Sequence, residues 1–370
     1  MQVEPMATRN AICLCADARM MIPAMFVAGS VLAMSSRNDV PFDIHVFSEP
    51  SEVTDLQRAW MESNGIRLYT DFDLSAYHGL FDRPGNRLSA ATLTRLFLPS
   101  VLQNEYDRIL YLDADLTIHD DIAQIFTLDL GEHAFAAVRT GSTWRNPQER
   151  ADAESHFASL GMTEPYRYFN SGVLLVDVRE WLARGISENA LEFVHTSFDK
   201  CRLVDEDALN ATVDGEFCSI SPLWNMAPGM TLAQYKARTG WPIIVHHMGG
   251  TKPWRLFARR RSYAVGRYYY DLYRSFLEGT PWEEWLSEQW TLRDFGKYLE
   301  WEVATAVRSL TRRSQHRAHA EAAQRYWAEE HFADVEQGLV IRENGILRLQ
   351  HESKVRNVEP GQVPSGSEPG

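Results

Sequence analysis

The chain has 370 residues, which is enough for one large α/β domain with an appendage and excludes a small disulfide-stapled scaffold. Its 50 acidic residues outnumber its 37 lysines and arginines and give a net charge of −13, the wrong sign for a protein that follows nucleic-acid phosphates. With 45% hydrophobic and 11% aromatic residues, the composition is that of a globular protein with a real core. We therefore expect an ordered protein with no nucleic-acid partner.

The cysteines and the apolar stretches indicate the cellular compartment in which the protein resides. The four cysteines are Cys13, Cys15, Cys201 and Cys218. The first two are expected on one face of a buried strand, a poor place for a metal knuckle, so we expect a reducing compartment without disulfides. The longest apolar stretch, residues 20–34, is shorter than the roughly 20 residues that a bilayer span requires. These observations predict a cytoplasmic protein, with membrane association only through a surface.

Strands and helices alternate through the first two thirds of the chain. In chain order we expect strands at residues 11–16, 42–47, 66–69, 108–112, 134–138, 173–176 and 243–246, with helices at 22–33, 53–65 and 90–101. Gly65 is the expected C-terminal residue of the second helix. Alternation of this kind predicts an α/β fold whose mostly parallel sheet is covered by helices on both faces.

The texture changes near residue 255, which predicts a domain of residues 1–255 followed by an appendage. Residues 256–337 lack strand alternation and are rich in arginine and aromatic residues, so a helical appendage is expected there. Within residues 338–352, Asn344-Gly345 favours the tight turn of a β-hairpin. Residues 353–370 carry proline, glycine and serine with almost nothing to bury, and are predicted to be a disordered tail.

Two carboxylates directly follow the predicted strand at residues 108–112. Asp113 and Asp115 would lie at the carboxyl end of that strand, where ligands bind in open α/β sheets. Two such acids can hold a hard divalent cation, and the cation can neutralise a diphosphate. A solvated strand end or a helix cap near Asp120 would produce the same short pattern.

A second segment, residues 245–254, places an imidazole, two glycines and an ammonium group after an apolar strand. His246 could complete a metal shell, and the glycines would allow close approach to a phosphate. Lys252 could balance the negative charge on a departing diphosphate. A histidine at a strand end is often structural, but its combination with Asp113 and Asp115 favours a ligand role.

Together these segments resemble the family 8 retaining glycosyltransferases, a group that includes bacterial lipopolysaccharide galactosyl- and glucosyltransferases and glycogenin. The resemblance runs from about residue 11 to residue 254. It rests on six matches in the right order: Asp17 at a strand end, Arg95 within residues 90–96, Asp113-Ala114-Asp115, residues 168–175, residues 205–210, and His246 with Lys252-Pro253-Trp254. The resemblance implies a fold of the GT-A type, with a sheet that binds a nucleotide sugar.

The same resemblance implies the roles of individual residues. Asp113, Asp115 and His246 would bind Mn²⁺ or Mg²⁺, which bridges the diphosphate of a UDP-sugar. The implied donor-binding residues are Asp17 at the uridine end, Arg95, Ala114, Ser171, and Gly249 with Lys252 at the phosphates. The implied catalytic residues are Glu206, Asp205, Lys252 and Asn170. The expected activity is metal-dependent transfer of glucose or galactose, as an α-linkage, to a glycan, a glycolipid or another hydroxyl acceptor.

Retention of configuration leaves two routes open at Glu206. Either an enzyme carboxylate forms a covalent sugar intermediate, or departure and attack take place on the same face of the sugar, with the leaving diphosphate helping to deprotonate the acceptor. Many members of the family carry Gln where this chain carries Glu206, and an amide is a poor nucleophile. The carboxylate here removes that objection without deciding the route.

Two other functions fit parts of the sequence. Residues 113–117 also match the Asp-x-Asp-x-Thr motif of haloacid-dehalogenase-type phosphatases, although that motif usually follows the first strand of its fold. A catalytically inactive sugar-binding protein is the other alternative. The presence of Asp113, Asp115, His246 and Lys252 together argues against it.

The segment of residues 255–319 has its own two interpretations. It contains twelve lysines and arginines against eight acids, a net charge of +4, which leaves −17 for the rest of the chain. A basic and aromatic segment can lie on an anionic membrane and bring an enzyme to a lipid-linked acceptor. Alternatively, Trp282, Trp285 and the tyrosines at 268–270 pack helices against the catalytic domain.

Overall fold

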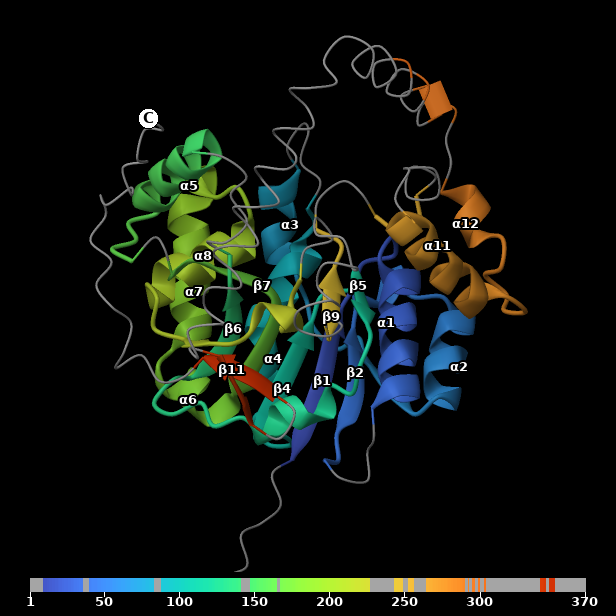
Figure 1. The fold of residues 1–370 in the computed structure, drawn as a ribbon, viewed down its shortest axis with the longest axis horizontal. Helices are drawn as coiled ribbons and strands as arrows, with labels where there is room; N and C mark the ends of the chain where they lie inside the picture. Colours follow the sequence, from blue (N-terminus) through green and yellow to red (C-terminus); the bar gives the residue numbers. More distant parts are fainter. Residues whose placement is uncertain are drawn as a thin grey trace, which may run out of the picture.

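A computed structural model gives the fold of the chain (Figure 1). It describes residues 9–35, 40–82, 88–140, 147–164, 167–226, 243–248, 252–255 and 264–289, and then 292, 295–296, 299, 303, 340–343 and 346–349. Of the sequence predictions, Gly249, the turn at 344–345, the tail at 353–370 and most of the segment 256–337 lie outside these residues.

A seven-stranded sheet forms the centre of the molecule. Its strands are β1 (Asn10–Cys15), β2 (Asp43–Phe47), β3 (Ile66–Tyr69), β4 (Arg108–Leu112), β6 (Phe135–Arg139), β7 (Phe169–Asp177) and β8 (Cys218–Ser219). They lie in the order β3-β2-β1-β4-β7-β6-β8, and only β7 runs antiparallel to its neighbours. The predicted α/β fold with a mostly parallel sheet is confirmed.

Helices cover both faces of the sheet. They are α1 (Met21–Met34), α2 (Asp55–Ser63), α3 (Ser75–Phe81), α4 (Thr94–Leu102), α5 (Pro147–Ser159), α6 (Val178–Ala183), α7 (Ile186–Ser197), α8 (Val204–Val213), α11 (Ala264–Leu277) and α12 (Trp285–Glu288). Side chains of β1 alternate between the faces: Ile12 and Leu14 join the cluster around α1, whereas Ala11 and Cys13 join the cluster of α4, α6, α7 and α8. Figure 1 shows α1, α2 and α11 on one side of the molecule and α5, α7 and α8 on the other.

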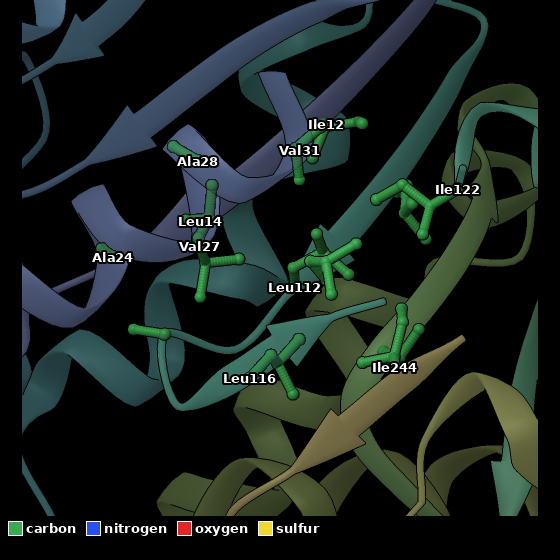
Figure 2. Packing of buried hydrophobic residues seen from close by; sticks show 14 of the residues in the cluster. Ile12, Leu14, Ala24, Val27, Ala28, Val31, Leu112, Leu116, Ile122 and Ile244 are labelled. Atoms are coloured by element: carbon green, nitrogen blue, oxygen red, sulfur yellow. The ribbon is translucent and has the colours of Figure 1, made fainter. Parts of the chain in front are cut away.

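A two-stranded ribbon lies outside the main sheet. In it, β5 (Leu116–Ile118) pairs antiparallel with β9 (Ile244–His246), and Leu116 lies opposite His246. The expected strand at 243–246 is therefore real but is not a strand of the main sheet. Leu116 and Ile244 pack with Val27 of α1 and Leu112 of β4 in one apolar cluster (Figure 2), which fixes the ribbon against the sheet.

Two of the predicted helices differ from the prediction in their first turn. The helix expected at 53–65 starts at Asp55 because Thr54 caps it, accepting from the backbone N–H of Gln57 at 3.3 Å while the Gln57 side chain accepts from the N–H of Thr54 at 2.9 Å. Gly65 follows its end with φ of +67°, as its expected position requires. The helix expected at 90–101 begins as a short 3-10 helix, Ala90–Leu93, and continues as α4.

Helix α11 shares the apolar cluster of α1 and the main sheet. Its Tyr273 stacks on Phe26 of α1 with ring centroids 3.9 Å apart, and a Cβ on Gly29 would lie 3.1 Å from Phe276. Helix α1 is apolar all round because the sheet covers one side and α11 the other. Tyr269 and Tyr270 are buried as well, so for this part of residues 255–319 the packing interpretation is right.

Farther along the chain, β10 (Val340–Glu343) and β11 (Ile346–Leu349) pair antiparallel, with Val340 opposite Leu349. Among the described residues, no helix combines the length and the apolarity that crossing a membrane requires.

Candidate functional site

Three potential metal ligands meet where the sheet and the ribbon join. Asp113 follows β4, Asp115 precedes β5, and His246 ends β9. His246 Nε2 lies 3.2 Å from Asp115 Oδ1 and 3.5 Å from Asp113 Oδ2, and one ligand atom from each residue lies within 4.8 Å of the others. The pairing of Leu116 with His246 produces this arrangement, because it brings β9 beside the two acids.

The backbone of β7 forms a wall of this cluster at Gly172. Its carbonyl accepts a hydrogen bond from the N–H of Asp113 at 2.8 Å. A Cβ on Gly172 would lie 2.7 Å from Asp113 Oδ2 and 2.8 Å from His246 Nδ1, so any other residue would intrude on the cluster. The cluster offers two carboxylates and one imidazole as ligands, and Gly172 adds no side chain beside them. This arrangement fits a divalent cation.

A pair of amides orients the imidazole. His246 Nδ1 lies 2.9 Å from Asn225 Oδ1 and 3.1 Å from Asn170 Oδ1. Asn170 Oδ1 also accepts from the Gly172 N–H at 3.0 Å and from Asn225 Nδ2 at 2.7 Å, which identifies it as an acceptor. A proton on Nδ1 is therefore donated to these oxygens, and Nε2 faces the two carboxylates.

Charges within the cluster stabilise one another. Burial alone would lower the pKa of His246, but Asp115 and Asp113 outweigh it and raise that pKa. Burial works in the opposite direction on Asp115, yet His246 and Lys252 lower its pKa. The Lys252 ammonium forms an ion pair with Asp115 and donates to the His247 carbonyl at 2.9 Å. Lys252 is thus brought to the cluster, as the sequence predicted.

Arg95 of α4 connects the candidate metal ligand Asp113 with a second acidic group. Its side chain forms ion pairs with Asp113 at 2.9 Å and Asp205 at 3.1 Å. It also donates to the backbone carbonyl of Ser171 at 3.0 Å and to Ser171 Oγ at 2.9 Å, and lies 4.4 Å above the ring of Tyr111. Burial opposes the guanidinium charge, but Asp113 and Asp205 outweigh burial and raise the pKa of Arg95.

The second acidic group is the first turn of α8. Glu206 Oε2 accepts from Asn170 Nδ2 at 2.7 Å and from the Ser171 N–H at 3.0 Å, and Ser171 Oγ donates to Asp205 at 3.1 Å. Burial raises the pKa of Glu206 to about 8, against the lowering effect of the Ser171 hydrogen bond. Burial also raises the pKa of Asp205, although Arg95 counteracts it. The structure thus brings together five residues predicted from sequence: Arg95, Asn170, Ser171, Asp205 and Glu206.

Asp17 lies at a separate pocket of about 360 Å³. Its carboxylate accepts from the N–H of Met20 at 3.0 Å and from Ser89 Oγ at 3.0 Å. The pocket is lined by Ala16, Asp17, Arg19, Ser48, Glu49, Glu52, Phe72, Leu74, His78, Ser89, Ala90, Ala91 and Thr94. One lining residue, Thr94, directly precedes Arg95 in α4. Ala114 is different: its methyl group is buried in the apolar cluster, which leaves only its backbone for a ligand.

Sequence reasoning missed three residues of the site. Tyr111 donates to Asp113 Oδ1 at 2.6 Å, and the two-residue spacing on one strand was a usable signal for it. Gly172 could have been suspected as a glycine within an apolar strand pattern. Nothing local to Asn225 reveals that its amide reaches the imidazole of His246.

Comparison with known proteins assigns these features to one family. The family described as glycosyl transferase family 8 matches residues 11–258. General stress protein A of Bacillus subtilis (strain 168) is 28% identical over 211 residues, which cover 53% of this chain and 68% of that protein. Lipopolysaccharide 1,2-glucosyltransferase of Escherichia coli (strain K12) is 30% identical over 205 residues, which cover 53% of this chain and 56% of that protein. The matched part therefore spans about half to two thirds of these relatives.

Solved structures agree. The galactosyltransferase LgtC, in complex with donor and acceptor sugar analogs, superposes with a TM-score of 0.57 at 25% identity, covering 74% of this chain and 98% of LgtC. The bifunctional glycosyltransferase WbbM shares the fold, with a TM-score of 0.57 at 19% identity over 78% of this chain and 53% of WbbM. On the family match, which covers most of the chain, this protein belongs to glycosyl transferase family 8.

Proposed function

We propose that this glycosyltransferase moves glucose or galactose from a UDP-sugar to a hydroxyl group of a glycan or lipid-linked acceptor, with formation of an α-linkage. The observation that carries the proposal is the convergence of Asp113, Asp115 and His246 beside Gly172, joined through Arg95 to Asp205. Similarity to a lipopolysaccharide 1,2-glucosyltransferase and to a galactosyltransferase supports a hexose donor.

A cation of the Mn²⁺ or Mg²⁺ type would be held by Asp113, Asp115 and His246. When bound, such a cation supplies positive charge that neutralises a diphosphate leaving group. We assign the same task to the Lys252 ammonium, and to the backbone of Gly249 a contact with the phosphates. The chain thereby concentrates positive charge where negative charge grows as the sugar departs.

The donor would extend from the Asp17 pocket to α8. Phe72 and Leu74 offer the pocket an apolar side for a nucleoside base, and we place the uridine end beside Asp17, whose carboxylate already accepts from Arg19, Met20 and Ser89. At the other end, Arg95, Asn170 and Ser171 surround the space in front of Asp205 and Glu206, where we place the donor sugar. The backbone of Ala114 lies between the two metal-binding acids and would follow the diphosphate.

The state of Glu206 favours departure and attack on the same face of the sugar. With a pKa of about 8, Glu206 carries a proton in most molecules at neutral pH. A protonated carboxyl group is a poor nucleophile, and one oxygen of this group is already engaged by Asn170 and Ser171. We therefore assign Glu206 the task of orienting Asn170 and the sugar.

The setting of the reaction is also a proposal. The positions of the four cysteines favour the reducing cytoplasm, as argued from the sequence. A peripheral contact with an anionic membrane through residues 255–319 would bring the enzyme to a lipid-linked acceptor. Four exposed apolar residues in that segment support the contact: Leu292, Phe295, Leu299 and Val303.

The test is a UDP-sugar hydrolysis panel with and without Mn²⁺, which requires no acceptor. We expect UDP release from UDP-glucose or UDP-galactose by the wild-type protein. Asp113→Ala and Asp115→Ala should abolish it and remove Mn²⁺-dependent UDP binding, because each deletes a carboxylate of the cation site. Asp71→Ala, which removes an exposed carboxylate elsewhere, is the matched control and should behave as wild type.

Each contrary outcome identifies a different error. Unchanged Mn²⁺ dependence of UDP binding in both variants would show that the cation site is wrongly placed. Release of phosphate from phosphomonoesters, without UDP release, would favour the phosphatase alternative. Calorimetric binding of UDP with Mn²⁺ and no turnover with any donor or acceptor would favour an inactive sugar-binding protein.

A further inference from the structure

The third acid of the α8 turn, Asp207, is buried on the side of the helix away from the donor site. Its side chain is 1% exposed. Oδ1 accepts from Tyr168 OH at 2.7 Å, Oδ2 accepts from the backbone N–H groups of Arg202 and Leu203 at 2.6 and 2.9 Å, and both oxygens lie 3.1 Å from His156 Nε2. With its lone pairs occupied in this way, Asp207 has no free oxygen to offer a sugar.

The partners of Asp207 come from the two elements that build the donor-sugar site and from one that does not. Tyr168 immediately precedes β7 and stands two residues before Asn170, whereas Asp207 immediately follows Glu206. One hydrogen bond therefore joins the strand that carries Asn170 to the helix that carries Glu206. His156 comes from α5, which contributes no predicted site residue.

A second buried residue of α8, Asn210, adds hydrogen bonds between α8 and β7. Asn210 Oδ1 accepts from the Phe169 N–H at 2.8 Å, and its Nδ2 donates to the Phe169 carbonyl at 2.9 Å. Asn210 lies one turn after Glu206, whose backbone carbonyl also accepts from Asn210 Nδ2 at 2.9 Å. Together Asp207, Asn210, Tyr168 and His156 form what we call the α8 clamp.

The clamp fixes how α8 is rotated about its axis. Successive helical side chains point about 100° apart, so the turn can present Asp205 and Glu206 to Arg95, Asn170 and Ser171 only if Asp207 points to the opposite side. No side chain caps α8 at Leu203; the Asp207 carboxylate instead binds the N–H groups of the two residues before the helix. Rotation or fraying of this turn would move both site carboxylates at once.

We infer that His156 and Tyr168, acting through Asp207, are positioning residues of the transfer reaction, because they set the orientation of Asp205 and Glu206 without touching the donor. The inference rests on the proposed function. It predicts that a change on α5 lowers the rate of the chemical step and leaves nucleotide binding intact. Misplacement of reacting groups by about 1 Å can cost roughly 10²-fold in rate.

The test compares His156→Ala with a control of similar structural cost, Phe157→Leu. Phe157 neighbours His156 on α5 and stacks on Tyr168 with centroids 4.1 Å apart, and no hydrogen bond joins it to Asp207 among the contacts described. For His156→Ala we expect kcat of UDP-sugar hydrolysis to fall roughly 10-fold or more, with KM and the calorimetric affinity for UDP within about 2-fold of wild type. Phe157→Leu should lower the unfolding temperature to a similar extent and keep the wild-type kcat.

Two further variants keep the inference testable if His156→Ala folds poorly. His156→Gln places an amide N–H near the Asp207 carboxylate and should recover most of the lost kcat. Tyr168→Phe removes one hydroxyl group, keeps the ring stacked on Phe157, and should lower kcat by several fold with KM unchanged. Equal kcat in His156→Ala and Phe157→Leu, no recovery in His156→Gln, or an unchanged kcat in Tyr168→Phe would overturn the positioning role.

Failure of the proposed function would look different. If the wild-type protein releases no UDP from any UDP-sugar, the proposed function and the role inferred within it both fall. If the wild-type protein turns over and the clamp variants match their control, only the positioning role falls.

Discussion

Lys252 places one ammonium group between the carboxylate of Asp115, a proposed metal ligand, and the backbone carbonyl of His247. We expect Lys252→Ala to lower turnover by roughly 10²-fold or more, because negative charge would grow on the diphosphate as the sugar leaves and only the proposed cation would remain to neutralise it. Steady-state kinetics with the UDP-sugar that the hydrolysis panel identifies would measure the loss.

Two further variants serve as comparisons for Lys252→Ala. Lys252→Arg should restore only part of the rate, since the planar guanidinium cannot replace the compact ammonium contact with Asp115. Lys200→Ala removes an exposed lysine that is distant from Lys252 in sequence, and it should leave turnover unchanged. Turnover of Lys252→Ala at the wild-type level would remove this residue from the mechanism.

The buried Glu206 should make the stability of the protein depend on pH. Burial raises its pKa from the ordinary value of 4.5 to about 8, so the folded state holds the proton more tightly than the unfolded state. The wild-type free energy of unfolding should therefore decrease as pH rises from 4.5 to 8, where the buried carboxyl group loses its proton. In Glu206→Gln this contribution disappears, and the variant should gain roughly 4 kcal/mol relative to wild type across that window.

Urea unfolding of both proteins at pH 5 and pH 8.5 checks the expectation. Glu62→Gln, an exposed position on α2, is the control and should show a pH-independent difference from wild type. A constant difference between Glu206→Gln and wild type at both pH values would mean that Glu206 is not buried as an acid.

Azide should not rescue the activity of Glu206→Gln, since rescue with inversion would indicate a covalent intermediate.

At the scale of the elements, α11 should behave as part of the catalytic core. Tyr273 is fully buried between Phe26 and Trp254, whose ring centroids lie 3.9 and 5.2 Å from its own. Tyr273→Ala should lower the free energy of unfolding by about 3 kcal/mol through the cavity it leaves. Tyr268→Ala on the same helix truncates a ring that is 40% exposed and should cost much less. Equal losses in denaturant unfolding would show that α11 is not docked on α1.

The sequence predicted the elements whose signals are local. The sheet strands are short apolar runs, and Asp113 was correctly placed because carboxyl ends of parallel strands share one edge. The ribbon partner of β5 was not predictable, since β9 is three residues long and lies more than a hundred residues away. Helix α7 was not predicted, although its buried residues Ile186, Ala190 and Val194 recur every four residues.

The site shows the same division between local and distant causes. The sequence pointed to residues 205–210 as part of the site, and three acids of this stretch lie in the first turn of α8, where the helix dipole favours them. Which way each acid points was not predicted, because that depends on partners far away in the chain: Arg95 for Asp205, and His156 for Asp207. Residue types can therefore identify a site before sequence reasoning can assign orientations within it.

The whole molecule divides its charge unevenly, with +4 on residues 255–319 and −17 on the remainder. In the same segment Leu292, Phe295, Leu299 and Val303 are each helical and at least 47% exposed, and residues three and four apart share a face wherever a helix is continuous. We expect binding to vesicles that contain anionic lipid, weakened by added salt. Phe295→Asp with Leu299→Asp should abolish co-sedimentation with these vesicles.

An exposed apolar residue outside the segment supplies the control. Leu56 on α2 is 59% exposed, and Leu56→Asp should leave vesicle binding unchanged. A wild-type protein that stays in the supernatant, or a double variant that binds as well as wild type, would contradict the membrane contact.

Gly172 is a position at which this protein tolerates almost no substitution. Alanine is among the mildest replacements a buried position can receive, yet here its methyl group would collide with Asp113 and His246. Every charge of the site and the whole apolar core would survive such a replacement, while the cation site we propose would close. A lineage carrying this sequence could thus lose its chemistry in one mutational step and still produce a folded, nucleotide-sized pocket beside Asp17, without any outward sign in composition or charge.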